Sequence, residues 1–229
     1  KLAVYPHVDA VLAGQDVLLN AMVTAAKGTV IEIGAENMYW QDKGAYTGET
    51  SPAALADLGI SRVIIGHSER RNYFRETDEM VNLKTLAALR NGLSPIIAID
   101  EAVQLESLND HAHWIVNQVV ESLKGVTHEE MGRLMLAYEP TAAIGSGQAM
   151  GPDAAQKSLR VIRQTVADMF DQDVADHVRV LYGGSVKPAN AYELLKQPDI
   201  DGVLVGDAAL DAATFIELIS LAEQAKRNL

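Results

Sequence analysis

The chain has 229 residues, 48% of them apolar, and 19 basic against 31 acidic side chains give a net charge of −12. This acidic balance argues against a nucleic-acid partner or an anionic membrane surface, and no apolar segment reaches the roughly 18 residues of a membrane span. The sequence contains no Cys, which excludes disulfides, thiolate metal sites and cysteine nucleophiles. We therefore expect a cytoplasmic enzyme or binding protein.

Short apolar, β-branched runs recur along the chain, with amphipathic stretches between them. Runs that are apolar on both faces are typical of buried parallel strands, and the stretches between them predict helices. Seven strands are predicted, at residues 2–5, 30–33, 62–65, 95–99, 134–138, 178–181 and 202–205.

Several predicted helices carry start and stop signals. Ser51-Pro52 places a capping residue before a first-turn proline, and Thr127 with Glu130 fits a capping box. Asn91-Gly92 is expected to end the helix that begins near Thr77. The alternation of strands and helices shows no break and no linker, so we expect residues 1–229 to form one α/β domain.

Periodicity alone does not distinguish an open doubly wound sheet from a barrel. The glycine-rich dinucleotide fingerprint is absent after the first predicted strand, where Pro6-His7-Val8-Asp9 follows.

Polar and small residues follow the carboxyl ends of the predicted strands, the edge at which βα proteins bind ligands. A carboxylate and an imidazole on two such strand ends can act as base and acid on one small substrate, and Glu139 and His67 are the candidates. Glycines and a serine that open helices after the last two strands present backbone N–H groups to an anion. This pattern favours a small phosphorylated substrate.

Six motifs in family order resemble those of the triosephosphate isomerase family. They are Gly34-Ala35-Glu36-Asn37, Gly44 to Ser51, Ile65 to Arg71, Ala137-Tyr138-Glu139-Pro140, Ala143-Ile144-Gly145-Ser146-Gly147 and Tyr182-Gly183-Gly184-Ser185-Val186. The resemblance covers about residues 30–226 and implies a TIM (β/α)8 barrel. It also implies an isomerase that interconverts dihydroxyacetone phosphate and glyceraldehyde 3-phosphate in glycolysis and gluconeogenesis, without metal or cofactor.

The same resemblance implies roles for individual residues. The family is itself the standard example of a glutamate base paired with a histidine kept neutral by a helix N-terminus, and these roles fall on Glu139 and His67. Residues 140–151 resemble the family's lid.

Further positions follow from the resemblance. The phosphate is expected to contact Gly145, Ser185 and Gly206, with Asp207 beside it, while Ser68 and Glu101 have supporting roles. The loop that begins at Lys43 and ends at Ser51 is expected to insert into a second subunit, which makes a homodimer.

The sequence departs from the family pattern in several places. Nothing before Leu2 supplies the family's Asn-x-Lys, so we expect its first βα unit and catalytic lysine to be absent from this sequence. Asp100 replaces a glycine, Ala142 a tryptophan and Gln148 a lysine. Asp207 replaces a glycine and brings a negative charge to the phosphate loop, and Ala209 stands where a serine is common.

Two alternatives therefore stay open: an isomerase for a related sugar phosphate, such as a tetrulose phosphate, and a non-catalytic family member that binds without turnover. The survival of both His67 and Glu139 argues against the second. Glu69, Arg70 and Arg71 are interpreted as structural ion-pair partners. Asp100 and Glu101 are neighbours on a strand and point to opposite faces, which disfavours a paired-carboxylate site.

Overall fold

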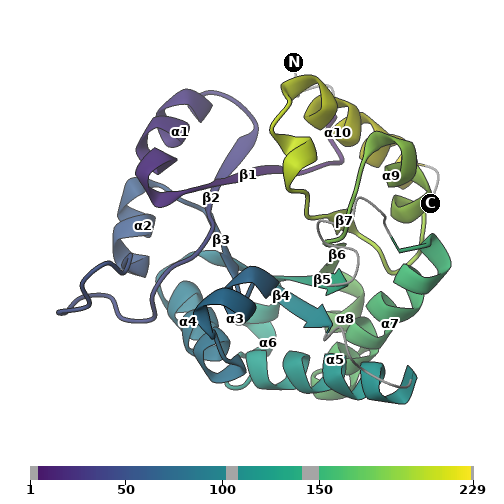
Figure 1. Ribbon diagram of the computed structural model, residues 1–229, viewed down its shortest axis with the longest axis horizontal. Helices are drawn as coiled ribbons and strands as arrows, with labels where there is room; N and C mark the ends of the chain where they lie inside the picture. The colour runs from purple at the N-terminus through teal and green to yellow at the C-terminus, as the bar shows by residue number, and fades with distance from the viewer. Residues whose placement is uncertain (1–4, 102–107, 141–149, 228–229) are drawn as a thin grey trace. The chain divides into compact units, whose positions relative to one another are not determined.

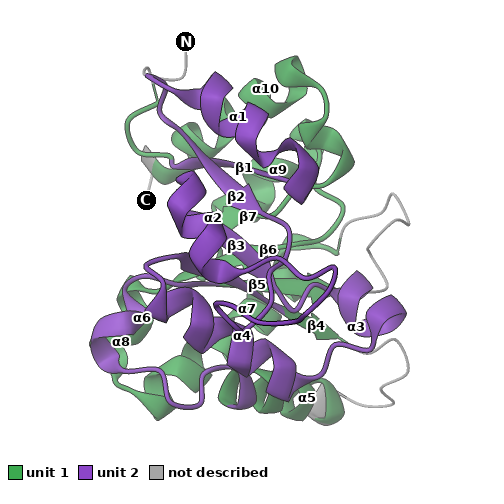
Figure 2. Ribbon diagram, turned by 90° about the vertical axis from the view of Figure 1, so that its left-hand side faces the viewer, with its two compact units in different colours: residues 1–8, 99–120, 136–229 green, residues 9–98, 121–135 purple. Residues whose placement is uncertain are grey.

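The computed structural model describes residues 5–101, 108–140 and 150–227 (Figure 1). Its contacts divide the chain into two compact units (Figure 2). Unit 2 comprises residues 9–98 and 121–135, and unit 1 comprises residues 1–8, 99–120 and 136–229. The sequence-based expectation of one domain stays a prediction, because this division does not test it.

Unit 2 is built on parallel strands in the order β1, β2, β3 and β4. Ala10 pairs with Ile31, Gly34 with Arg62, and Arg62 with Ser94. The strands and helices are β1 (Ala10–Gly14), α1 (Leu19–Ala26), β2 (Ile31–Ala35), α2 (Pro52–Leu58), β3 (Arg62–Ile65), α3 (Ser68–Phe74), α4 (Asp78–Arg90), β4 (Ser94–Glu101) and α6 (His128–Met131). The last residues of β4 belong to unit 1.

Unit 1 contains strands in the order β5, β6 and β7, with β6 and β7 parallel. Its elements are α5 (Leu108–Ser122), whose last two residues belong to unit 2, β5 (Met135–Pro140), whose first residue does, α7 (Pro152–Met169), α8 (Gln172–His177), β6 (Arg179–Tyr182), α9 (Pro188–Leu195), β7 (Gly202–Val203), the short helix η3 (Asp207–Ala209) and α10 (Ala212–Arg227). Every residue of β5 is buried, as a strand with apolar side chains on both faces requires.

The predicted helix signals are confirmed. Ser51 accepts a hydrogen bond from the Ala54 N–H at 3.3 Å at the start of α2, and Thr127 forms a full capping box with Glu130. Thr77 caps α4, which ends at Asn91 before Gly92 with φ 80°. These caps satisfy backbone groups that lack partners inside the helix, and residues close in sequence supply them.

Six predicted strands correspond to β2 through β7, and the one at residues 62–65 matches β3 residue for residue. The prediction for residues 2–5 falls almost wholly outside the described residues, and Tyr5 lies in no strand. The sequence analysis missed β1, which begins just after the Pro6 to Asp9 segment. The run Ala-Val-Leu-Ala-Gly has little β-branched character, and pairing along its whole length with β2 makes it a strand.

Among the described residues, no helix is both long and apolar enough to cross a membrane.

Candidate active site

His67 is the second residue after β3 and caps the N-terminus of α3. Its Nδ1 accepts a hydrogen bond from the Glu69 backbone N–H at 3.3 Å. A ring nitrogen that accepts carries no proton, so the proton of the neutral imidazole is on Nε2. His67 can therefore present a neutral N–H donor, which is the form a helix N-terminus favours over a cation.

A buried ionic network lies beneath the turn that carries His67. One carboxylate oxygen of Glu76 accepts the Gly66 N–H at 3.1 Å, and the other accepts Arg70 Nε at 2.7 Å and Lys84 Nζ at 2.6 Å. Lys84 also donates to Asn37 Oδ1 at 2.8 Å, after the end of β2. The side chains of Glu76 and Lys84 are only 2% and 3% exposed.

The neighbouring charges in this network change the pKa values of Glu76 and Lys84. Burial alone would raise the pKa of Glu76, but Lys84 and Arg70 outweigh it and hold this pKa below its usual value. Burial lowers the pKa of Lys84, although Glu76 opposes the change. A buried pair of this kind persists only because every polar atom finds a partner.

The sequence analysis interpreted Arg70 and Arg71 as ion-pair partners, and the structure confirms this. Arg70 pairs with Glu76, and Arg71 Nη1 lies 2.5 Å from Asp78 Oδ1. Glu69 Oε2 lies 3.6 Å from Nδ1 of His67. Ser68 is the first residue of α3 and is 2% exposed.

Glu139 is the last residue but one of β5 and is 1% exposed. The turn after β6 lies directly against it, where the Gly183 N–H donates to the Tyr138 carbonyl at 2.7 Å. A Cβ on Gly183 would lie 3.1 Å from both the Tyr138 oxygen and Glu139 Cγ. Glycine at this position lets the backbone pass close to the side chain of Glu139, so Gly183 and Glu139 pack directly against each other.

Gly184 solves a similar steric problem for Tyr182. A Cβ on Gly184 would lie 2.3 Å from the Tyr182 hydroxyl oxygen, a distance that no side chain tolerates. That hydroxyl accepts the Met150 N–H at 2.9 Å, at the residue that follows the undescribed stretch 141–149.

Glu101 ends β4 and contacts two side chains of unit 1. Tyr138 donates its hydroxyl to Oε2, and Nδ1 of His111 contacts Oε1. Burial, with the Glu101 carboxylate as the next cause, raises the pKa of Tyr138, so its phenol stays a donor. Because Tyr138 directly precedes Glu139, Glu101 holds the strand next to the candidate base, and its supporting role stays a prediction.

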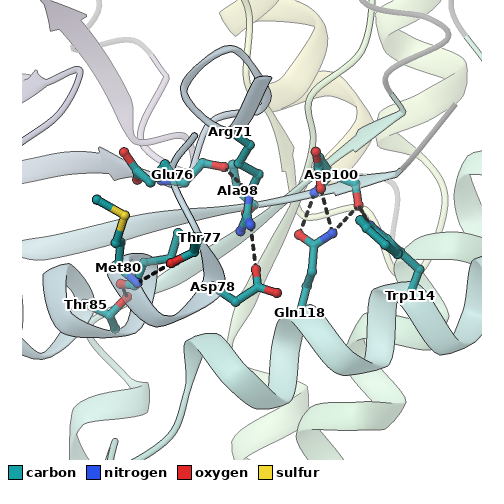
Figure 3. Close-up of polar contacts among 12 residues, drawn as sticks. Arg71, Glu76, Thr77, Asp78, Met80, Thr85, Ala98, Asp100, Trp114 and Gln118 are labelled. Carbon is teal, nitrogen blue, oxygen red and sulfur yellow. Dashed lines mark hydrogen bonds and ion pairs between the residues drawn. The ribbon is translucent and has the colours of Figure 1, made fainter. Parts of the chain in front are cut away.

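Asp100, which replaces a glycine of the family pattern, is buried and takes part in a separate set of contacts (Figure 3). Gln118 Nε2 donates to its Oδ1 at 2.6 Å, and Trp114 Nε1 donates to its backbone oxygen at 2.9 Å. Asp100 and Glu101 thus bind different neighbours, as expected for adjacent strand residues.

The predicted phosphate positions of unit 1 lie in two loops. The Ser185 carbonyl accepts Asn190 Nδ2 at 3.0 Å, ahead of α9. Gly206 and Asp207 are both exposed at the start of η3. Gly145 lies outside the described residues, as do Ala142 and Gln148.

Within unit 1 the structure therefore brings together Glu139, Glu101 and the Gly183-Gly184 turn, while His67 and Ser68 start a helix of unit 2. The sequence analysis missed the roles of Tyr138 and Tyr182. A buried tyrosine needs a partner for its hydroxyl, and a tyrosine at the end of an apolar run was present in both motifs.

No group of three or more His, Cys, Asp or Glu side chains suited to a metal ion occurs in the part of the chain that the structure describes.

Comparison with known proteins gives consistent matches. The family model described as triosephosphate isomerase matches residues 1–222. The chain is 48% identical to a triosephosphate isomerase of Lactobacillus helveticus over 220 residues, which are 96% of this chain and 87% of that protein. It is 49% identical to that of Lactiplantibacillus plantarum over 213 residues, 93% of this chain and 84% of that protein. These matches include residues of both units.

Proposed function

The chain belongs to the triosephosphate isomerase family, and from this premise we propose how it interconverts dihydroxyacetone phosphate and glyceraldehyde 3-phosphate. Membership also gives the fold class, a TIM (β/α)8 barrel, and the enzyme class, an intramolecular aldose-ketose isomerase.

Glu139 is proposed as the base and His67 as the electrophile. The reaction removes a proton from the hydroxyl-bearing carbon beside the carbonyl and returns it to the former carbonyl carbon, through an enediolate. The hydroxyl proton moves to the other oxygen, so that carbonyl and hydroxyl exchange places. A carboxylate shielded from water, like that of Glu139, can move this proton, and the Nε2–H of a neutral His67 can donate to the oxygen that becomes negative. The observation that carries this proposal is the hydrogen bond that Nδ1 of His67 accepts, because it places the proton of the neutral ring on Nε2.

The test is the exchange of a substrate proton with solvent. With dihydroxyacetone phosphate in D2O, the protein should form glyceraldehyde 3-phosphate that carries deuterium at C2, as seen by NMR. His67→Gln should lower turnover by about 10²-fold, because it removes the electrophile but leaves Glu139 in place. Unchanged kinetics in this variant would show that His67 is structural.

The phosphate group of the substrate is proposed to lie at Gly145, Ser185 and Gly206. Backbone N–H groups at loop ends and helix starts suit an anion of this kind. Asp207 then places a carboxylate beside the phosphate, and its exposure means that water screens much of the repulsion.

Asp207→Gly is expected to tighten the binding of a phosphate-bearing enediolate analogue by about threefold to tenfold, because a like charge is removed. Titration calorimetry at low and high salt measures it, and the gain should shrink as salt rises. Equal affinity would mean that the Asp207 side chain turns to solvent. Weaker binding in the variant would instead favour the related sugar-phosphate substrate.

A cytoplasmic homodimer is proposed as the working form, with the loop from Lys43 to Ser51 in the interface. In unit 2 the loop residue Tyr46 is 41% exposed, and Val17, Tyr73 and Phe74 are 82%, 78% and 66% exposed. Aromatic side chains such as those of Tyr46, Tyr73 and Phe74 are among the residue types enriched where protein chains meet.

A further inference from the structure

The backbone around His67 is tightly constrained. Gly66, the residue before it, has φ 75°, a conformation that favours glycine. A Cβ at Gly66 would lie 2.8 Å from Val81 Cγ2 and 3.2 Å from Nη2 of Arg71. The guanidinium of Arg71 thus packs directly against the turn that carries His67.

Arg71 bonds to the peptide groups on both sides of His67. Its side-chain Nε donates to the Gly66 carbonyl at 2.7 Å, which belongs to the peptide that leads into His67. Its backbone N–H donates to the His67 carbonyl at 3.1 Å, which belongs to the peptide that leads out. Arg71 therefore contacts both peptides that define the φ and ψ angles of His67. Its side chain bonds to the first, and the Arg70 N–H, at 2.8 Å from the His67 carbonyl, shares the second.

The guanidinium is itself held in place by two further contacts (Figure 3). Nη1 lies 2.5 Å from Asp78 Oδ1 at the start of α4, and Nη2 donates to the Ala98 carbonyl of β4 at 3.4 Å. The side chain is 10% exposed. Because the guanidinium is planar and rigid, fixing two of its nitrogens determines where the third points.

We propose that Arg71 is a positioning residue for His67, which fixes the direction of the imidazole by holding the peptides before and after it. The inference rests on the proposed role of His67. Arg71 does not need to touch the substrate, and Asp78 acts one step further out, as the anchor of the guanidinium.

Arg71→Lys tests the proposal. A lysine keeps the positive charge and can still pair with Asp78, but it has no fork to reach the Gly66 carbonyl at the same time. The expected kcat is about 10-fold to 100-fold lower, since small misplacements of a catalytic group cost rates of this order, while KM changes by less than about threefold. In protein labelled with ¹⁵N-histidine, the Nδ1 and Nε2 signals of His67 should shift.

Arg62→Lys is the matched control. Arg62 is the first residue of β3, the strand that precedes His67. Its guanidinium makes a comparable bidentate contact, with Nε and Nη2 at 2.8 and 3.1 Å from the carboxylate oxygens of Glu32. It should lose stability but keep kcat and the His67 signals of the parent. Comparing the two variants separates the general effect of losing a bidentate arginine contact from the effect of losing the contacts of Arg71.

Asp78→Asn is the second variant, in case Arg71→Lys does not fold. It keeps Arg71 but weakens its anchor, so the His67 signals should shift in the same direction and kcat should fall by about threefold. The proposal is overturned if His67→Gln lowers kcat while a folded Arg71 or Asp78 variant leaves both kcat and the His67 signals unchanged. A lower kcat with unmoved signals would also overturn it. If His67→Gln itself has no effect, the proposed function of His67 fails, whereas shifted signals would still support the positioning.

Discussion

Replacing Glu139 by glutamine is expected to lower turnover by about 10²-fold to 10⁴-fold while the protein stays folded. Glutamine has nearly the same shape as glutamate, so it should keep the close packing against Gly183. A larger side chain would not fit there, because the Gly183 backbone lies close to the side chain at position 139. It cannot take a proton from carbon, however, so only the proton-transfer step should suffer. Steady-state kinetics with glyceraldehyde 3-phosphate and far-ultraviolet circular dichroism measure the two quantities.

Glu193→Gln provides the control for this experiment. Glu193 is exposed on α9 and pairs with Lys196, so its variant should keep the turnover of the parent. Near-normal turnover in Glu139→Gln would remove the assignment of the base. An unfolded Glu139→Gln variant would contradict the expectation that the amide fits beside Gly183.

Much of the fold could be predicted because its signals are local. The apolar run at residues 62–65 is β3, and the capping box at Thr127 forms as the spacing predicts. The missed strand β1 shows where this approach fails. It pairs with β2, on the far side of α1, and its own composition carries little strand preference.

In the candidate site, too, the residues with local sequence signals could be predicted and those that depend on distant contacts could not. His67 and Glu139 lie in short motifs near the carboxyl ends of β3 and β5, so the sequence could propose them as candidates. The residues that support them could not be identified this way, because burial is a tertiary property. Lys84 lies in the middle of α4, where a lysine ordinarily faces water, and only the packed structure places it against Glu76.

The Glu101 and Tyr138 contact illustrates why pairings are hard to predict. Glu101 belongs to β4 and Tyr138 to β5, which are consecutive strands in the sequence, but the two residues are 37 positions apart. The family resemblance implied a supporting role for Glu101 but no partner for it, and the structure shows a hydrogen bond to the residue next to Glu139.

Lys84→Met should destabilise the protein by about 3 kcal/mol, the low end of the cost of breaking a buried ion pair. Methionine fills a similar volume, so the loss comes from Glu76, whose carboxylate stays buried with fewer positive partners. The cost is limited because Arg70 still pairs with Glu76 at 2.7 Å. Chemical denaturation measures the free energy of unfolding.

The pH dependence of the stability difference between the parent and Lys84→Met tests whether the lost ion pair with Glu76 causes it. The pKa of Glu76 is lowered in the folded parent, so its contribution to stability is present above its unfolded pKa of about 4.3 and is lost as pH falls through the folded value. The gap between parent and Lys84→Met should therefore narrow below about pH 4.3. Lys124→Met is the control: its pair with Glu121 is exposed, so the expected loss is below about 1 kcal/mol at every pH. If the gap stays constant down to acid pH, lost packing rather than an uncompensated carboxylate causes the destabilisation, and the ionic role of Lys84 is wrong.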